Sequence, residues 1–487
     1  MLVLHPIIPI TNDALWLCVH YPLYNVYLLG EESGCFLQAH WDGGECMRSS
    51  RNKRPLWFRG IIAGPLLALL PHTAFAGGFE VQQAAYFQGM SFAGVATGGP
   101  SIASLAWNPA TSAFAGNGLT TEVSVAMVFT TADLTVPTGL PQGGATAVDV
   151  GRDSPLGASF ATWRVDEKTV LGLSITAPFG LLTKPNNPDW AGRTDALTSK
   201  IFSLNATPSV SYEIMPGLAI GAGVQFQYFD LVRLTAATPL PPPFPLGAQV
   251  ISDINGDDFG VGFMVGVNFS PAPGTSLGLG FRSSIHHQLE GDTTIGSIAQ
   301  APIRADIDLP DKVTFSFRQA VSPSARVLGT VDWANWSRFG VIPIVLQGAL
   351  PDFAPAGATV ANLDFRWRDG WLFALGGEYD WSPNLTMRAG VNYDISPVDS
   401  ATARLLQVPD SNRVWVSVGA SYKLSSASSI DLAYSHGFFE NNAPFNRRPA
   451  SVALPPLLGE ADLSSDMISV SWKMRWGGPS YVAAPLK

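Results

Sequence analysis

The sequence predicts an all-β fold, a transmembrane antiparallel β-barrel of about fourteen strands whose lumen holds an N-terminal plug. Three observations lead to this prediction. Bulky apolar residues alternate with small or polar residues over long stretches, short turn motifs recur between these stretches, and an export signal precedes them.

The composition disfavours several classes of protein. Charged residues make up 14% of the chain, below the roughly 25% usual in soluble proteins. Hydrophobic residues reach 46%, yet the mean hydropathy is only +0.18. No uninterrupted run of about 20 apolar residues follows position 76, which disfavours a helical membrane protein. The net charge of −9 disfavours nucleic-acid binding, because a nucleic acid requires a basic surface.

An export signal occupies residues 47–76. The basic stretch 48–54 is followed by an apolar run, residues 61–70, and then by Ala74-Phe75-Ala76. A basic region, an apolar region and a small-residue cleavage site in this order are typical of a secretory signal peptide. We therefore expect the mature chain to begin at Gly77.

Residues 1–46 contain neither Lys nor Arg, unlike the rest of the chain. We interpret them as an N-terminal extension that results from a start site assigned upstream of Met47. The alternative, a membrane helix over Leu15–Leu29, is weakened by a histidine, a proline and an asparagine inside that stretch. All three cysteines precede Met47, so the sequence after it offers no disulfide framework, thiolate metal site or cysteine nucleophile.

Residues 117–476 are expected to form the barrel wall. In Phe259–Phe269, Phe and Val alternate with Gly, Met and Asn, and similar runs occupy Leu218–Tyr228 and Ile468–Trp476. In a barrel the bulky set faces lipid and the other set faces the lumen. A soluble β-sandwich also alternates, but its water-facing side would carry many Lys and Glu residues, whereas here that side is mostly Gly, Ser, Thr and Asn.

Six short turn motifs separate the strands. They are Asp166–Lys168, Met215–Gly217, Pro271–Gly274, Ser322–Ser324, Ser382–Asn384 and Ser425–Ser428. Six turns join twelve strands, and one further strand on each side, at about 118–130 and 465–476, makes about fourteen. Longer connections, among them 181–200, 236–253, 342–368 and 440–461, fill the opposite side. This arrangement is typical of the outer membrane of a Gram-negative bacterium.

Residues 77–116 precede the first strand and are rich in Gly, Ala and Ser without clean alternation. We expect them to form a plug in the lumen, and a disordered periplasmic tail is the alternative. Proline fixes φ and asparagine can bond its own backbone, so the sequence predicts a turn at Asn108-Pro109. Asn108, Pro109 and Ala110 are therefore candidate gating residues.

Apolar residues in the long external connections are candidates for capturing an apolar solute, because exposed apolar patches usually mark a binding site. They are Ile342, Ile344, Leu346, Phe353 and Leu457. The alternative is that these residues pack on one another as a lid.

Arginines that alternation directs into the lumen are candidates for binding a carboxylate head group, because a guanidinium fork pairs with a carboxylate. They are Arg282, Arg318, Arg388 and Arg413, of which Arg282, Arg388 and Arg413 rank first because they lie in segments that carry the family resemblance given below. The alternative is that these arginines pair with lumen acids such as Glu378 and Asp332 and brace the wall, since buried charges are rarely left alone.

Several segments resemble the FadL-type long-chain fatty acid and hydrocarbon transporters. The segments are Ala177–Gly180, Asp189–Arg193, Gly280–Ser283, Leu289–Asp292, Leu309–Lys312, Trp333–Ser337, Met387–Gly390 and Pro409–Arg413. In the plug, Trp107–Ala110 is similar to the Asn-Pro-Ala hatch motif of that family. The resemblance covers nearly all of residues 77–476 in order, and it implies a fourteen-stranded barrel closed by an N-terminal hatch.

The sequence departs from the family pattern at two places. Ser101–Leu105 stands where the family often has an acidic residue ahead of the hatch motif. Residues 477–487 form a C-terminal tail beyond Trp476, which fits the role of the family's terminal aromatic residue.

The sequence does not indicate an enzyme. Three histidines follow the signal peptide, and they offer no metal-ligand cluster. Gly89–Ala93 only half-resembles a nucleophile elbow, and no phosphate-binding glycine loop is present. We expect no enzymatic activity, no cofactor and no metal.

The resemblance implies passive uptake of hydrophobic compounds, foremost long-chain fatty acids, by a monomer whose partners are a lipophilic small molecule and outer-membrane lipid. A general porin and a loop-based binding or adhesion protein are the alternatives.

Overall fold

The computed structural model describes residues 17–21, 24–31, 34–39, 79–138, 143–240, 242–245, 247–447 and 456–477. The chain divides into two compact units, Met1–Gly60 and Ile61–Lys487. In the first unit, β1 (Leu17–Tyr21), β2 (Tyr24–Glu31) and β3 (Gly34–Ala39) form an antiparallel three-stranded sheet. The predicted signal peptide and the tail beyond Gly477 lie outside the described residues, and the origin of residues 1–46 stays a prediction.

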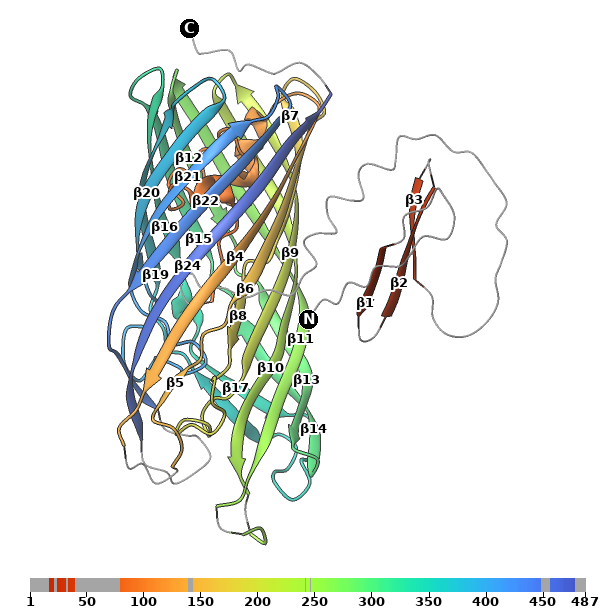
Figure 1. Ribbon diagram of the computed structural model, residues 1–487, viewed down its shortest axis with the longest axis vertical. Helices are drawn as coiled ribbons and strands as arrows, with labels where there is room; N and C mark the ends of the chain where they lie inside the picture. The colour runs from red at the N-terminus through yellow and green to blue at the C-terminus, as the bar shows by residue number, and fades with distance from the viewer. Residues whose placement is uncertain are drawn as a thin grey trace. The chain divides into compact units, whose positions relative to one another are not determined.

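The second unit contains a closed antiparallel barrel, in which the first wall strand pairs with the last (Figure 1). The segments of its wall are β4 (Leu119–Thr135), β5 (Ala147–Asp149), β6 (Ser154–Arg164), β7 (Thr169–Thr176), β8 (Gly180–Thr183), β9 (Ser199–Met215), β10 (Leu218–Pro239), β11 (Gln249–Ala272), β12 (Thr275–Arg282), β13 (His286–Ile295), β14 (Ala299–Asp308), β15 (Lys312–Ala320), β16 (Ala325–Ala334), β17 (Val341–Leu346), β18 (Thr359–Asp364), β19 (Gly370–Asp380), β20 (Leu385–Ile395), β21 (Arg413–Lys423), β22 (Ser428–Phe439), β23 (Ala443–Arg447) and β24 (Leu457–Trp476). Some wall strands consist of two such segments in line, so the barrel has fourteen strands, as predicted.

Each of the six predicted turns joins two wall segments at the same end of the barrel, for example Ser322–Ser324 between β15 and β16. The opposite end differs from the prediction, because the strands continue further than the alternation suggested. Ile342–Leu346 was expected in a loop and is part of strand β17. Of residues 236–253, also expected as a loop, 236–239 lie in β10 and 249–253 lie in β11.

The alternation divides the two faces of the wall as predicted. Phe259, Val261 and Val265 on β11 point outward and are 60%, 57% and 42% exposed. Lumen-facing residues such as Gln225 and Asn268 are buried. On β19 the outward aromatics Trp371 and Tyr379 stand near the two ends of the strand, as is typical of the two interfaces of a membrane-spanning barrel.

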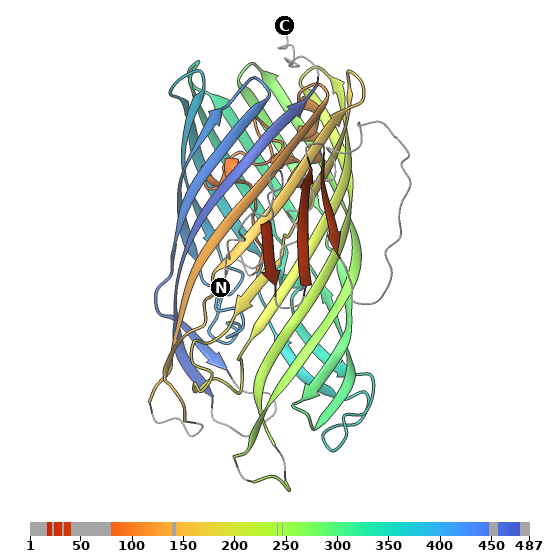
Figure 2. The ribbon, with the colours of Figure 1, turned by 45° about the vertical axis from the view of Figure 1, so that its right-hand side comes forward.

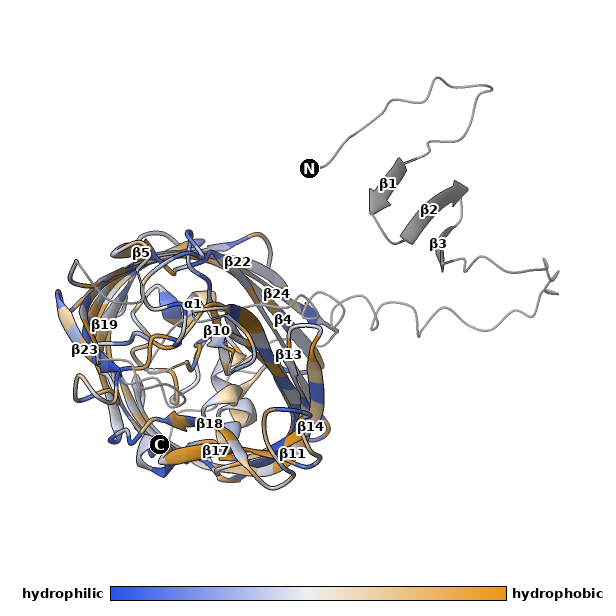
Figure 3. Ribbon diagram, turned by 90° about the horizontal axis from the view of Figure 1, so that it is seen from below, coloured by the Kyte–Doolittle hydropathy of each residue, from blue (hydrophilic) through white to orange (hydrophobic). Residues whose placement is uncertain are grey.

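Residues 79–116 form a plug inside the barrel, nearer the end with the short turns (Figures 1 and 2). The plug contains a short helix, α1 (Ala85–Gln88), and two 3₁₀ helices, η3 (Ala103–Ala106) and η4 (Pro109–Phe114). Viewed along the barrel, the strands close a ring around it (Figure 3). The plug prediction is confirmed, and the alternative of a disordered tail is wrong. No helix among the described residues is long and apolar enough to cross a membrane.

The outward face of β11 must stay apolar for the barrel to assemble. We expect Val265→Arg to destabilise the barrel by about 2–4 kcal/mol, because a charged side chain near the bilayer midplane loses its hydration. Heat-modifiable migration on a gel measures folding, and Val265→Leu serves as the control. Equal folding of both variants would show that Val265 does not face lipid.

Candidate binding site in the barrel lumen

Six aromatic side chains gather in the lumen to form what we call the aromatic cluster. They are Phe79, Phe179, Trp336, Phe339, Phe365 and Trp367, all buried. Phe79 belongs to the plug and lies among the others, with ring centroids 5.1 Å from Trp336, 5.7 Å from Phe339 and 5.8 Å from Phe179. Most of these pairs are edge-to-face or tilted, the arrangements that aromatic rings prefer.

The wall supplies these rings where its hydrogen-bond ladder is interrupted. The β16–β19 ladder ends at the pair Ala334 and Gly370, and the β17–β18 ladder begins at Val341 and Asp364. Between them the chain forms η5 (Trp336–Arg338) and turns its aromatic side chains inward. The Asp369 carboxylate accepts hydrogen bonds from Trp333 Nε1 and from the main-chain N–H of Ser337, and so joins the two sides of the interruption.

A charged layer lies next to the cluster. Lys312 Nζ lies 2.6 Å from Glu80 of the plug and 2.8 Å from Asp332 of the wall. Arg282, on the neighbouring segment β12, donates from Nη2 to the carbonyl of Ala106 in the plug at 2.7 Å. The lumen therefore offers an apolar surface followed directly by a charged layer that contains two cations and two carboxylates.

The start of the plug covers a second interruption of the wall. The ladder between β6 and β7 pairs Ser159–Arg164 with Val170–Ile175. Beyond it, Val81 N–H donates to Pro178 O at 2.7 Å, and Gly180 N–H donates to Phe79 O at 2.9 Å. The plug thus runs as a short strand along the wall and satisfies main-chain groups that the ladder leaves open.

Lumen-facing glycines let the plug backbone approach the wall closely. A Cβ added at any of five of them would overlap the plug. They are Gly221, Gly266, Gly278, Gly280 and Gly390, on β10, β11, β12 and β20. Asn108 uses this space: its amide donates to Val267 O in the wall at 2.9 Å and to Ala96 O in the plug at 2.8 Å. Its Oδ1 accepts from Ala110 N–H and caps η4, with Pro109 in the first turn.

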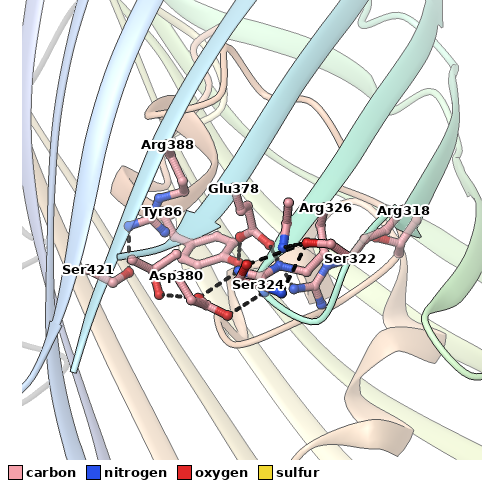
Figure 4. A network of polar contacts seen from close by, with 12 residues as sticks. Tyr86, Arg318, Ser322, Ser324, Arg326, Glu378, Asp380, Arg388 and Ser421 are labelled. Atoms are coloured by element: carbon pink, nitrogen blue, oxygen red, sulfur yellow. Dashed lines mark hydrogen bonds and ion pairs between the residues drawn. The ribbon is translucent and has the colours of Figure 1, made fainter. Parts of the chain in front are cut away.

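A polar network holds α1 to the wall (Figure 4). Tyr86 donates to Glu378, whose carboxylate also accepts from Arg318 at 2.7 Å and from Arg326 at 2.9 Å. The guanidinium of Arg388 lies over the Tyr86 ring, 4.1 Å from its centroid. Burial raises the pKa of the Tyr86 phenol, and the Glu378 carboxylate adds to the rise, so the phenol stays protonated as a donor.

Two lumen cavities lined by the described residues are small. The cavity beside Arg282 and Lys312 has a volume of about 30 Å³, and another beside Phe92 and Trp415 has about 20 Å³. A single water needs roughly 10–15 Å³, so each cavity admits only one or a few waters. A solute of any size requires the plug or the cluster to move.

A family model described as an outer membrane protein transport protein (OMPP1/FadL/TodX) matches residues 67–476, most of the chain. The chain belongs to this FadL/TodX family. It is a β-barrel protein of the Gram-negative outer membrane, as predicted, and the family description is that of a transport protein rather than an enzyme.

Relatives and solved structures agree with this membership. A long-chain fatty acid transport protein of Salmonella typhi is 26% identical over 55% of this chain and 66% of its own length. The chain spans about half to two thirds of the length of the first curated relatives that it matches. A Pseudomonas aeruginosa FadL homologue has a TM-score of 0.73 at 22% identity, covering 82% of this chain and 100% of that one. The toluene transporter TodX of P. putida has a TM-score of 0.62 at 17% identity, covering 83% and 99%. At these identities the two structures show the fold.

The three arginines predicted to bind a head group lie in two different environments. Arg388 pairs with Asp431 at 3.1 Å, and Arg413 pairs with Asp394 at 2.6 Å and with Asp410. These contacts favour the alternative that these two arginines brace the wall. Arg282 instead reaches the plug.

The predicted capture residues are mostly buried. Ile342, Ile344 and Leu346 lie on β17 and pack in the apolar cluster around the aromatic rings, with Phe353 partly buried against it. Leu457 opens β24 and is buried in a separate cluster. They pack as a lid would, and their role in capture stays a prediction.

Sequence reasoning missed the aromatic cluster and the Lys312 ion pairs. Phe179 and Trp336 lie in two of the segments that carried the family resemblance, Ala177–Gly180 and Trp333–Ser337. In both segments the alternation fails, and a break in alternation that contains aromatic residues was the available signal.

The contacts of Asn108 predict its role in holding the plug. Asn108→Ala removes three hydrogen bonds and leaves buried carbonyls unsatisfied, at about 1–3 kcal/mol for each such group. We expect a loosened plug in a folded barrel, measured as increased ion conductance across a planar bilayer. Asn384→Ala, in an exposed turn, is the control. Unchanged conductance of the Asn108 variant would contradict this role.

Proposed function

We propose that the barrel is a passive channel for uptake of hydrophobic compounds, foremost long-chain fatty acids. The observation that carries the proposal is that the aromatic cluster lies beside two cations in one closed lumen. Lys312 is paired with carboxylates, whereas Arg282 bonds a neutral carbonyl. An apolar chain fits beside the aromatic rings, and a carboxylate fits beside the cations. A general porin would require an open polar path, which a lumen filled by a plug does not offer.

The head-group role falls to Arg282. Among the described residues, its side chain donates a hydrogen bond to a neutral carbonyl, that of Ala106. The carboxylate of Glu80 lines the same cavity as Arg282, but Glu80 and Asp332 are both bonded to Lys312. A fatty-acid carboxylate would give the Arg282 guanidinium a charged partner and would replace a contact to the plug. Arg388 and Arg413 already have charged partners and are secondary candidates.

Solute entry and plug movement are coupled through residues 79–81. Phe79 occupies the centre of the aromatic cluster, Glu80 bonds Lys312, and Val81 pairs with Pro178 at the interruption of the wall. A solute that takes the place of the Phe79 ring therefore weakens the attachment of the same segment to the wall. Rearrangement of this segment would open the path, with no covalent chemistry.

The aromatic cluster favours a second candidate solute, a monoaromatic hydrocarbon. The Phe79 side chain is itself a single benzene ring held edge-to-face among other rings. One structurally similar protein is named as a toluene transporter. Such a solute would use the cluster and would not need Arg282.

The experiment compares Arg282→Ala with the wild type for binding of a long-chain fatty acid and of an uncharged alkane. We expect fatty-acid binding to weaken by about 1.5–3 kcal/mol, the range for hydrogen bonds to charged groups, and alkane binding to stay the same. Arg233→Ala is the matched control, because Arg233 is an exposed arginine that pairs with Asp253 outside the lumen site.

Equal losses for both ligands would show that Arg282 supports the wall rather than the head group. Unchanged binding of both ligands would assign binding to apolar contact alone.

A further inference from the structure

The outer wall carries two adjoining hollows on its lipid-facing side. We call the hollow nearer the external end of the barrel, which is drawn at the bottom of Figure 1, the upper hollow, and the other the lower hollow. The lower hollow, of about 440 Å³, is lined by outward residues of β15, β16, β19 and β20, among them Phe317, Gly329, Phe373 and Leu375. The upper hollow, of about 490 Å³, is lined by Ser337, Arg368, Asp369, Trp371 and Ile395. They adjoin because the Trp371 and Phe373 rings, one from each hollow, are stacked 6.1 Å apart on β19.

Each hollow has a cause in the sequence. At Gly329 the outward face of β16 lacks a side chain, and the ring of Phe317 lies over it. The upper hollow lies where the wall ladder is interrupted between the β16–β19 and β17–β18 pairs. There the chain turns Trp336, Phe365 and Trp367 into the lumen, so these three rings do not fill the outside of the wall.

The two hollows lie on opposite sides of a membrane interface. Along β19 the outward aromatics Trp371 and Tyr379 stand near the two ends of the strand, with Phe373 and Leu375 between them. Such aromatic girdles mark the boundaries of the hydrocarbon region. The lower hollow therefore lies among acyl chains, and the upper hollow lies at the level of the external head groups.

The upper hollow offers a cation to a head group. Arg368 is exposed, and its Nε donates to the carbonyl of Ser396 at 3.3 Å. Among the described residues no ion pair joins Arg368 to a carboxylate, whereas the neighbouring Arg338 and Arg366 pair with Asp311 and Asp364. Asp369 is already bonded to Trp333 and Ser337. The unpaired charge is thus a positive one, which suits an anionic ligand.

Other parts of the external rim are acidic. Asp230 and Asp257 face each other across β10 and β11, and Asp133 pairs in register with Asp462 across β4 and β24. An anionic head group would be repelled there. The hollow at Arg368 is distinguished by an apolar groove below it and an available cation beside it.

We propose that this outer face binds a phosphorylated glycolipid of the outer leaflet, with an acyl chain in the groove at Gly329 and a phosphate at Arg368. The outer leaflet of the Gram-negative outer membrane consists of lipopolysaccharide, whose lipid A anchor combines phosphates on a sugar pair with several acyl chains. The position of the upper hollow at the head groups, the positive charge of Arg368 and the apolar groove below it match that chemistry. This site lies on the outside of the wall and is separate from the lumen path.

The test is native mass spectrometry of the purified, delipidated full chain in detergent, titrated with diphosphoryl lipid A, with dephosphorylated lipid A and with phosphatidylglycerol. We expect diphosphoryl lipid A to bind most tightly. Arg368→Glu should weaken its binding about tenfold, as expected for losing one charge-assisted hydrogen bond, and should leave dephosphorylated lipid A unaffected. Val331→Trp places a larger side chain in the groove and should weaken both forms of lipid A.

Arg233→Gln is the control, because Arg233 is an exposed arginine of the external end that pairs with Asp253. Heat-modifiable migration confirms that each variant is folded, and Arg368, being exposed, keeps the test valid if Val331→Trp fails to fold. Unchanged binding of diphosphoryl lipid A by Arg368→Glu would overturn the proposal. Equal binding of phosphatidylglycerol by the wild type would overturn the assignment to a glycolipid.

Discussion

The structure depends on one constraint: inside a bilayer every main-chain N–H and C=O group must find a partner within the protein. The closed ladder from β4 round to β24 meets it over most of the wall. Where the ladder is interrupted, other groups take over. The plug residues Phe79 and Val81 bond the main chain at Pro178 and Gly180, and the Asp369 carboxylate bonds across the other interruption. Both interruptions supply aromatic rings to the lumen, so the site exists where the wall is not a simple sheet.

Buried charged side chains in the lumen also need partners, as the main-chain groups of the wall do. The lumen contains several cations, but most of them are neutralised by a specific acid, as Arg413 is by Asp394 and Asp410. Burying a charge without a partner costs folding free energy, whereas an ion pair holds the two segments that carry it in a fixed position. Arg282 differs, because among the described residues its side chain donates to the neutral carbonyl of Ala106 and not to a carboxylate. The apolar rings beside this part of the lumen make it suited to amphipathic solutes rather than to ions.

The sequence predicted the wall well because period-two alternation and turn residues are local. Phe259–Phe269 and Ser322–Ser324 needed no knowledge of the rest of the chain. The extent of the external strands was missed, since β17 is almost wholly apolar and contains Pro343, a pattern that also fits a loop. The aromatic cluster was missed for another reason. Phe79 and Trp336 are far apart in sequence, and only the strand register and the path of the plug bring them together. Alternation likewise directed Arg282 and Arg413 into the lumen without revealing which one has an acidic partner.

The pairing of β4 with β24 also constrains the order of assembly. The ring closes when the last strand of the wall joins the first, along a register that runs from Leu119 opposite Trp476 to Thr135 opposite Glu460. The plug immediately precedes β4 and touches glycines on strands distributed around the circumference. A plug that entered a finished barrel would have to push folded segments past side chains that fill the lumen. Enclosure of the plug before β4 pairs with β24 avoids this barrier, so we expect the plug to enter the lumen before the barrel closes.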